Sequence, residues 1–148
     1  MGEVMKNHNL VYGVVVTAML LASCGRGVST LPTTARVKVT GSVKEWKIDV
    51  NSKSIASPDV LFSISNKGTM KHEFVVVKTV FADGKIPVTG DHFKEDQVGV
   101  DVVDEISQFA AGTTAELSTT LSAGTYQLVF NLPGHYQAGM HTAFTVTT

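Results

Sequence analysis

The stretch GTYQLVFNLPGHYQAGM, residues 124–140, decides the fold of this chain. Residues 125–132 are rich in β-branched and aromatic side chains, which favour a strand. Pro133 and Gly134 then stop sheet pairing and turn the chain. A second strand-like run follows at residues 142–147. The stretch therefore predicts two strands of one β-structure, joined at its rim by a tight loop.

The same pattern extends outward from this stretch as far as Val37. Short runs of Val, Ile, Phe and Thr alternate with Gly, Pro, Asn and Asp, and no helical period of 3.6 is present. Eight strands in about 110 residues suit a sandwich or barrel. We predict an all-β, Greek-key sandwich whose strands cover residues 37–40, 43–50, 60–65, 72–80, 102–109, 115–121, 125–132 and 142–147.

Two further expectations concern the parts between and within these strands. Residues 81–100 are the least regular segment, and their charged residues predict an exposed loop or a short helix. The aromatic residues in the strand-like runs are predicted to pack in the core or across strands. They are Trp46, Phe62, Phe74, Tyr126 and Phe144.

The first residues form a leader. Lys6 precedes an apolar run at residues 10–22, which is too short to span a bilayer comfortably but suits the core of a signal peptide. The run ends in Leu-Ala-Ser-Cys, and this tetrapeptide resembles a bacterial lipobox whose Cys24 is acylated after cleavage. An uncleaved membrane anchor with an incidental cysteine is the alternative. Both interpretations place the folded domain outside the cytoplasm.

These signals divide the chain into three parts. Residues 1–23 are predicted to be the lipoprotein signal peptide, and residues 24–36, which are small, polar and Pro/Gly-containing, the lipidated flexible tether. Residues 37–148 form the predicted domain. The protein is thus expected to be extracytoplasmic and lipid-anchored to a bacterial membrane.

Charge and cysteine content exclude several classes of function. The chain has 12 Lys and Arg against 13 Asp and Glu, a net charge of -1, and no run of like charge that would bind nucleic acid. Its single cysteine can build neither an internal disulfide nor a thiolate metal cluster. No nucleophile with a base, phosphate-binding glycine loop or paired acids is evident, so we do not expect an enzyme.

The candidate metal ligands are two histidines and a methionine. His135 and Met140 flank the tight loop, and His72 begins another predicted strand after the turn at residues 66–68. Two imidazoles and a thioether form a soft to borderline set, which selects copper over magnesium, calcium or manganese and leaves zinc as a competitor. Met70 is a candidate extra ligand, because in an extended chain it shares a face with His72.

These two segments also resemble a known family. NKGTMKHEFVV, residues 66–76, and residues 124–140 are similar to the ligand segments of the plastocyanin-like and azurin-like cupredoxins of bacteria. The resemblance implies a cupredoxin-like β-sandwich that binds copper, Cu(I) or Cu(II). It implies His72 and His135 as the two histidine ligands, with Met140 as the axial methionine.

One position departs from the family. Where the resemblance places the cysteine ligand, this chain has Phe130, and a blue copper centre depends on that thiolate. The expected function is therefore copper trafficking, buffering or delivery through a His2Met site. An electron-transfer cupredoxin with an unusual redox centre, or a metal-free domain that acts as a binding module, are the alternatives. The expected partners are the copper ion, a copper donor, copper acceptor or redox protein, and the membrane through the lipid anchor.

Overall fold

The computed structural model describes residues 36–147. The predicted signal peptide, the lipidation site Cys24 and nearly all of the tether lie outside the described residues. Within residues 36–147 there is no helix of the length and apolar character needed to cross a membrane. The regular secondary structure of this part of the chain consists of strands alone.

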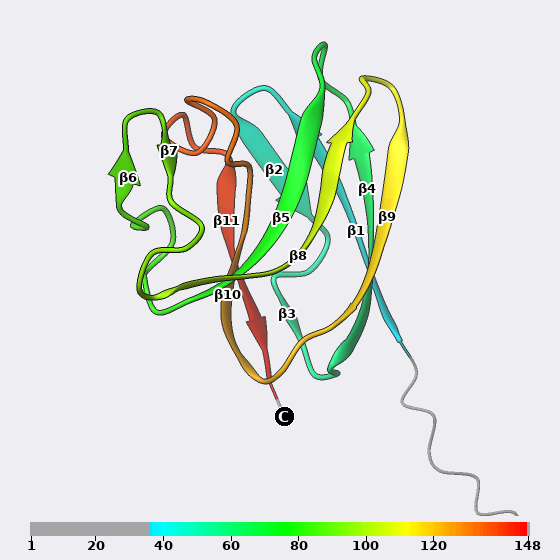
Figure 1. Cartoon of the computed structure of the whole chain (residues 1–148). Coiled ribbons are helices and arrows are strands. Elements are labelled where there is room, and N and C mark those ends of the chain that lie inside the picture. Colours follow the sequence, from blue (N-terminus) through cyan, green and yellow to red (C-terminus); the bar gives the residue numbers. More distant parts are fainter. Residues whose placement is uncertain (1–35, 148) are drawn as a thin grey trace, which may run out of the picture. The chain divides into compact units, whose positions relative to one another are not determined.

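Two sheets pack face to face, and a small hairpin lies beside them (Figure 1). The first sheet has the order β2 (Lys47–Val50), β1 (Val37–Lys44), β4 (Asp59–Asn66) and β9 (Thr114–Thr120). The second has the order β3 (Ser54–Ile55), β11 (His141–Val146), β10 (Gly124–Val129), β5 (His72–Thr79) and β8 (Val100–Phe109). The hairpin pairs β6 (Val88–Thr89) with β7 (His92–Phe93). The predicted all-β sandwich is confirmed.

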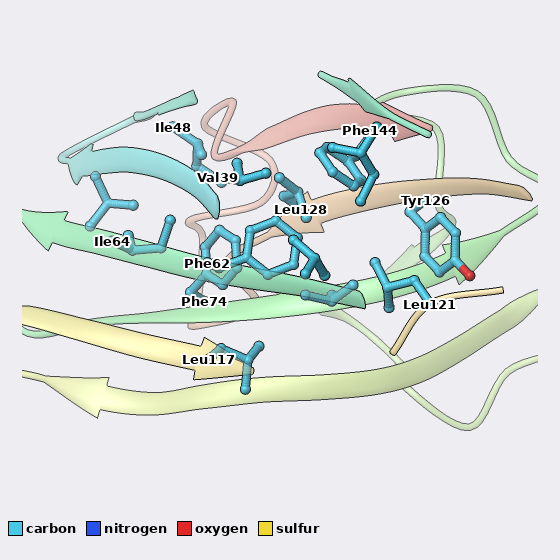
Figure 2. Close-up of a cluster of buried hydrophobic side chains, with 14 of the residues drawn as sticks. Val39, Ile48, Phe62, Ile64, Phe74, Leu117, Leu121, Tyr126, Leu128 and Phe144 are labelled. Carbon is cyan, nitrogen blue, oxygen red and sulfur yellow. The ribbon is translucent and has the colours of Figure 1, made fainter. Parts of the chain in front are cut away.

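The main core fills the space between the two sheets (Figure 2). Every second residue of β4 is buried, as expected of a strand with one face toward a core. Phe62 on this strand contacts Phe74 at 5.3 Å and Phe144 at 5.5 Å between ring centres, and both belong to the opposite sheet. Each buried phenyl ring contributes roughly 1.5–3 kcal/mol to folding. These aromatic contacts therefore hold the sheets together.

A second, smaller core covers the outer face of the second sheet. Ile86 and Phe93 are buried there against Val75, Val129 and Tyr136. The exposed loop predicted for residues 81–100 is confirmed for its charged residues, all of which are exposed, whereas no helix forms and two apolar side chains are buried. The segment forms turns and the β6–β7 hairpin, and its two buried apolar side chains cover sheet residues that would otherwise face water.

The strand boundaries differ most between β1 and β2. The sequence pattern predicts a break after residue 40, yet β1 continues to Lys44, and the chain turns at Glu45 and Trp46 instead. Gly41 and Ser42 remain paired because the neighbouring strands supply register partners on both sides. The tertiary pairing thus overrides a local turn signal.

Three connections meet at one end of the sandwich (Figure 1). The β4–β5 connection precedes His72, and the β10–β11 connection runs from Phe130 to Met140. The β1–β2 turn lies at the same end, because Val43 pairs with Asn66 at the end of β4. Val37, the first residue of β1, lies at the opposite end. The end that carries the two histidine segments therefore points away from the start of the domain.

Candidate metal centre

His72 and His135 come together at this end of the sandwich. His72 is fully buried as the first residue of β5, and His135, in the β10–β11 connection, is 9% exposed. Their ring centres lie 5.7 Å apart with an interplanar angle of 79°. The two imidazoles are thus direct neighbours despite their separation in the chain.

Hydrogen bonds fix the tautomer of each imidazole. His72 Nδ1 lies 3.1 Å from the side-chain oxygen of Asn66, and His135 Nδ1 lies 3.1 Å from the carbonyl oxygen of Pro133. Both oxygens can only accept, so each Nδ1 carries the proton and donates it. In the neutral ring, Nε2 then keeps its lone pair, which is the form that binds a metal ion.

Asn66 is the residue that orients His72, and it is almost completely buried. Its amide nitrogen donates to the carbonyls of Met70 and Phe109, and its oxygen also accepts from the Gly68 amide. All polar atoms of this side chain are therefore engaged, and the orientation of the amide group is fixed. The sequence pattern showed Asn66 only as a turn residue, because one of its partners, the Phe109 carbonyl, lies 43 residues away in the chain.

The two Nε2 atoms are buried and have no hydrogen-bond partner. A buried polar atom without a partner is costly and calls for an explanation such as a bound ion. A metal ion binds roughly 2 Å from an imidazole nitrogen, so two rings that share one ion have centres no more than about 6 Å apart. The observed 5.7 Å between His72 and His135 fits a shared ion.

Met140 and Phe130 lie beside the histidines in the core. The Met140 amide donates to the His135 carbonyl at 3.1 Å, and the Phe130 amide donates to the Met140 carbonyl at 3.0 Å. Both side chains are fully buried. The Phe130 ring meets the His72 ring edge to face at 5.2 Å. A phenyl group thus packs directly against one of the two imidazoles.

Met70 is placed differently. Its side chain is 43% exposed in the β4–β5 connection. The chain bends at residues 68–70, so Met70 does not continue the extended strand that would place it on the same face as His72. Within residues 36–147, no group of three His, Cys, Asp or Glu side chains could hold a metal ion. A metal held by the two imidazoles would therefore need a further ligand of another kind.

Burial and charge act on His72 in opposite directions. Burial lowers the pKa of His72, and the nearby Glu45 carboxylate partly opposes this. The lowered pKa keeps the imidazole neutral near pH 7, as metal binding requires. Glu45 itself is partly exposed, and hydrogen bonds, first of all from the Thr69 amide, lower its pKa to about 2. A permanent negative charge therefore lies close to the histidine pair.

Glu73 follows His72 and links the two histidine segments. Its carboxylate accepts a hydrogen bond from the amide of Asn131, which follows Phe130. Burial raises the pKa of Glu73, while the Asn131 amide opposes the rise. The side-chain oxygen of Asn131 accepts from the Phe93 backbone amide, and its side-chain nitrogen donates to the Phe93 carbonyl. These contacts tie β5, the β10–β11 connection and the β6–β7 hairpin together.

The other two described histidines lie apart from this pair. His92 is on the exposed hairpin, with its Nδ1 2.8 Å from Asp91. His141 follows Met140 but is paired with Asp83 at 2.9 Å and packs against Tyr136. Each is engaged by a carboxylate of its own. They provide matched controls for experiments on His72 and His135.

Comparison with known families adds one match. The family model described as the sulfocyanin (SoxE) domain matches residues 38–148, which is nearly the whole of the described part of the chain. No curated protein sequence matches the chain.

Solved structures share the fold at low sequence identity. Auracyanin from the photosynthetic bacterium Roseiflexus castenholzii is 17% identical, with a TM-score of 0.53 over 75% of this chain and 97% of that one. Auracyanin A from Chloroflexus aurantiacus, a blue copper protein, is 20% identical, with a TM-score of 0.54 over 76% and 99%. Rusticyanin from Thiobacillus ferrooxidans is 22% identical, with a TM-score of 0.55 over 76% and 77%.

Proposed function

Because the chain belongs to the sulfocyanin (SoxE) domain family of cupredoxins, we propose that it binds one copper ion through His72, His135 and Met140. The observation that carries the proposal is the pair of buried, unpartnered Nε2 atoms on adjacent imidazoles. Met140 supplies the sulfur, since its backbone is bonded to both His135 and Phe130. Two imidazoles and a thioether suit copper better than hard cations.

The proposed role is to carry and deliver copper. Phe130 occupies a position beside His72 where it offers no lone pair, so the strong thiolate bond of a blue copper centre is missing. A His2Met set accommodates cuprous ion, which tolerates few and soft ligands. Such a set holds copper without a covalency that would favour fast electron exchange. The protein would then be a copper-binding protein and not an enzyme.

Electron transfer is the second candidate. It is favoured by the family match and by the structural similarity to auracyanin A, a blue copper protein. The two roles differ in how copper behaves during a working cycle. A carrier gives up its ion to an acceptor, whereas an electron-transfer protein keeps the ion through repeated oxidation and reduction. Cyclic voltammetry on the loaded protein, together with transfer to a chelator, separates these roles.

We also propose that the protein works outside the cytoplasmic membrane, attached by a lipid at Cys24. The argument comes from the leader sequence and its Leu-Ala-Ser-Cys ending. We expect Cys24→Ala to move the protein from the membrane fraction to the soluble fraction, because the acceptor of the lipid is lost. Fractionation followed by mass spectrometry of the N-terminus measures this. Unchanged membrane attachment would favour the uncleaved anchor instead.

Copper uptake can be followed through Trp46, the only tryptophan of the chain. Its ring centre lies 5.4 Å from that of His135, so an ion bound at His135 will quench its fluorescence. We expect anaerobic titration of the full chain in detergent with cuprous ion to quench the emission up to one equivalent. Cys24→Ser in all samples removes the only thiol that could compete.

The His135→Ala variant is the control for this titration, and zinc is the competing metal. Quenching that persists in His135→Ala would place the ion elsewhere. A wild-type protein that takes up no copper would leave the metal-free binding module as the better description. Tighter binding of zinc than of cuprous ion would contradict the soft ligand set.

A further inference from the structure

Trp46 has an unusual backbone conformation. Among the described residues it is the only one other than glycine with a positive φ, at 66°. Bulky side chains rarely adopt this region, and a glycine would satisfy the same turn without strain. The Trp46 side chain is 53% exposed, so the core does not hold it there. The sequence pattern predicted a packed strand residue, and this prediction is wrong.

The Trp46 ring contacts the His135 side of the site. The two ring centres lie 5.4 Å apart at an angle of 55°. The Trp46 carbonyl oxygen also lies close to the β10–β11 connection. A Cβ atom placed on Gly139 would be 3.6 Å from this oxygen. The turn thus lies directly against the segment that carries His135 and Met140.

The neighbouring Glu45 contacts the other histidine segment. One oxygen of its carboxylate accepts from the Thr69 amide at 2.6 Å, the Thr69 hydroxyl at 2.9 Å and the Met70 amide at 3.3 Å. These bonds hold the β4–β5 connection against Glu45, next to His72. A Cβ atom at Gly68 would lie 2.6 Å from His72 Cε1 and 2.8 Å from Glu45, so only glycine fits between them.

Glu45 and Trp46 together form what we call the clasp: two adjacent residues of one turn that hold both histidine segments. We propose that the clasp controls the rate at which copper enters and leaves the site. This inference rests on the proposed copper function. Both Nε2 atoms are buried, so an incoming ion or a receiving ligand reaches them only after something moves. Trp46 is the exposed part of the clasp, and its side chain can turn outward into solvent without disturbing the core.

A gate changes rates more than affinities, because opening speeds both binding and release. A residue that only supports the fold would instead lower affinity and stability together. We therefore expect Trp46→Ala and Glu45→Gln to release copper at least about tenfold faster, with a much smaller change in Kd. Trp46→Phe, which keeps an aromatic cover, and Lys47→Ala, an exposed change in β2 directly after the turn, should stay close to wild type.

The measurement is stopped-flow transfer of cuprous ion from the loaded full chain to bathocuproine disulfonate, with Cys24→Ser in all samples. Equal transfer rates in Trp46→Ala and wild type, at equal affinity, would overturn the clasp and leave the copper proposal intact. A wild-type protein without copper binding would overturn the copper proposal instead.

A second readout tests the clasp without any metal. Diethyl pyrocarbonate modifies accessible neutral imidazoles, and mass spectrometry locates the modified residues. We expect His135 in metal-free Trp46→Ala to react at least about tenfold faster than in wild type, while His92 reacts equally in both. Unchanged reactivity of His135 would show that Trp46 does not cover it, whatever the protein binds.

Discussion

Replacing Phe130 with cysteine is expected to create an intensely coloured copper centre. The Phe130 amide is bonded to the Met140 carbonyl and its ring meets His72, so a thiolate at this position would face the ion that we propose between the histidines. Bound cupric ion would then have two imidazoles, a thiolate and a thioether, the set that gives blue copper its colour. A strong visible absorption band measures the outcome.

The colour is expected to be intense because a new copper–thiolate bond forms, whatever the change in copper affinity. Loss of the phenyl ring leaves a cavity, and we expect the metal-free variant to lose about 2–4 kcal/mol of its unfolding free energy. Chemical denaturation checks that the variant still folds. Phe130→Ser leaves a similar cavity without a thiolate, and Phe144→Cys places a thiol elsewhere in the core; neither should become coloured.

A folded Phe130→Cys protein that binds cupric ion without an intense band would contradict the placement of residue 130 at the metal. Colour in Phe144→Cys would contradict it as well, since any core cysteine would then suffice. We expect colour in Phe130→Cys alone. It would also support the proposal that Phe130 stands where a blue copper protein has its cysteine ligand.

Patterns that are local in the sequence predicted the corresponding parts of the structure. The run before Pro133 forms β10, and the loop after it brings Met140 to His135 through backbone hydrogen bonds. The alternation of apolar residues in β4 correctly predicts the buried Phe62. The proximity of His72 and His135 could also be predicted from the sequence. Each lies at the end of a predicted strand, and neighbouring strands of a sheet end at the same edge.

Features that depend on distant contacts were not predictable. Trp46 lies in a run that resembles a strand, and nothing local indicates that it turns outward to cover His135. Asn66 resembles any turn asparagine, yet its amide group joins segments that are far apart in the chain. Phe93 has charged neighbours that suggest exposure, but it covers the outer face of a sheet. In each case the partner that decides the outcome lies far away in the chain.

Removal of either central histidine is expected to lower cuprous affinity by more than about 100-fold. Loss of a mere supporting contact of a ligand already costs about 10–100-fold, and a ligand contributes more. His135→Ala opens the rim, whereas His72→Ala leaves a cavity in a fully buried position. Competition with a cuprous chelator of known affinity gives the Kd values, and circular dichroism confirms the fold.

His92→Ala and His141→Ala are the matched controls, because each of these imidazoles is engaged by its own carboxylate. Their Kd values should equal that of wild type. Met140→Leu keeps the volume of the side chain and removes the sulfur, so it should weaken cuprous binding without unfolding the protein. An equal loss of affinity in all variants would point to a general effect on the fold.

X-ray absorption at the copper edge of the cuprous-loaded protein addresses the metal environment itself, with Cys24→Ser so that the only sulfur ligands available are methionines. We expect two nitrogen neighbours near 2 Å, one sulfur neighbour, and the loss of one nitrogen in His135→Ala. A spectrum of oxygen neighbours, or one that His135→Ala leaves unchanged, would contradict this expectation.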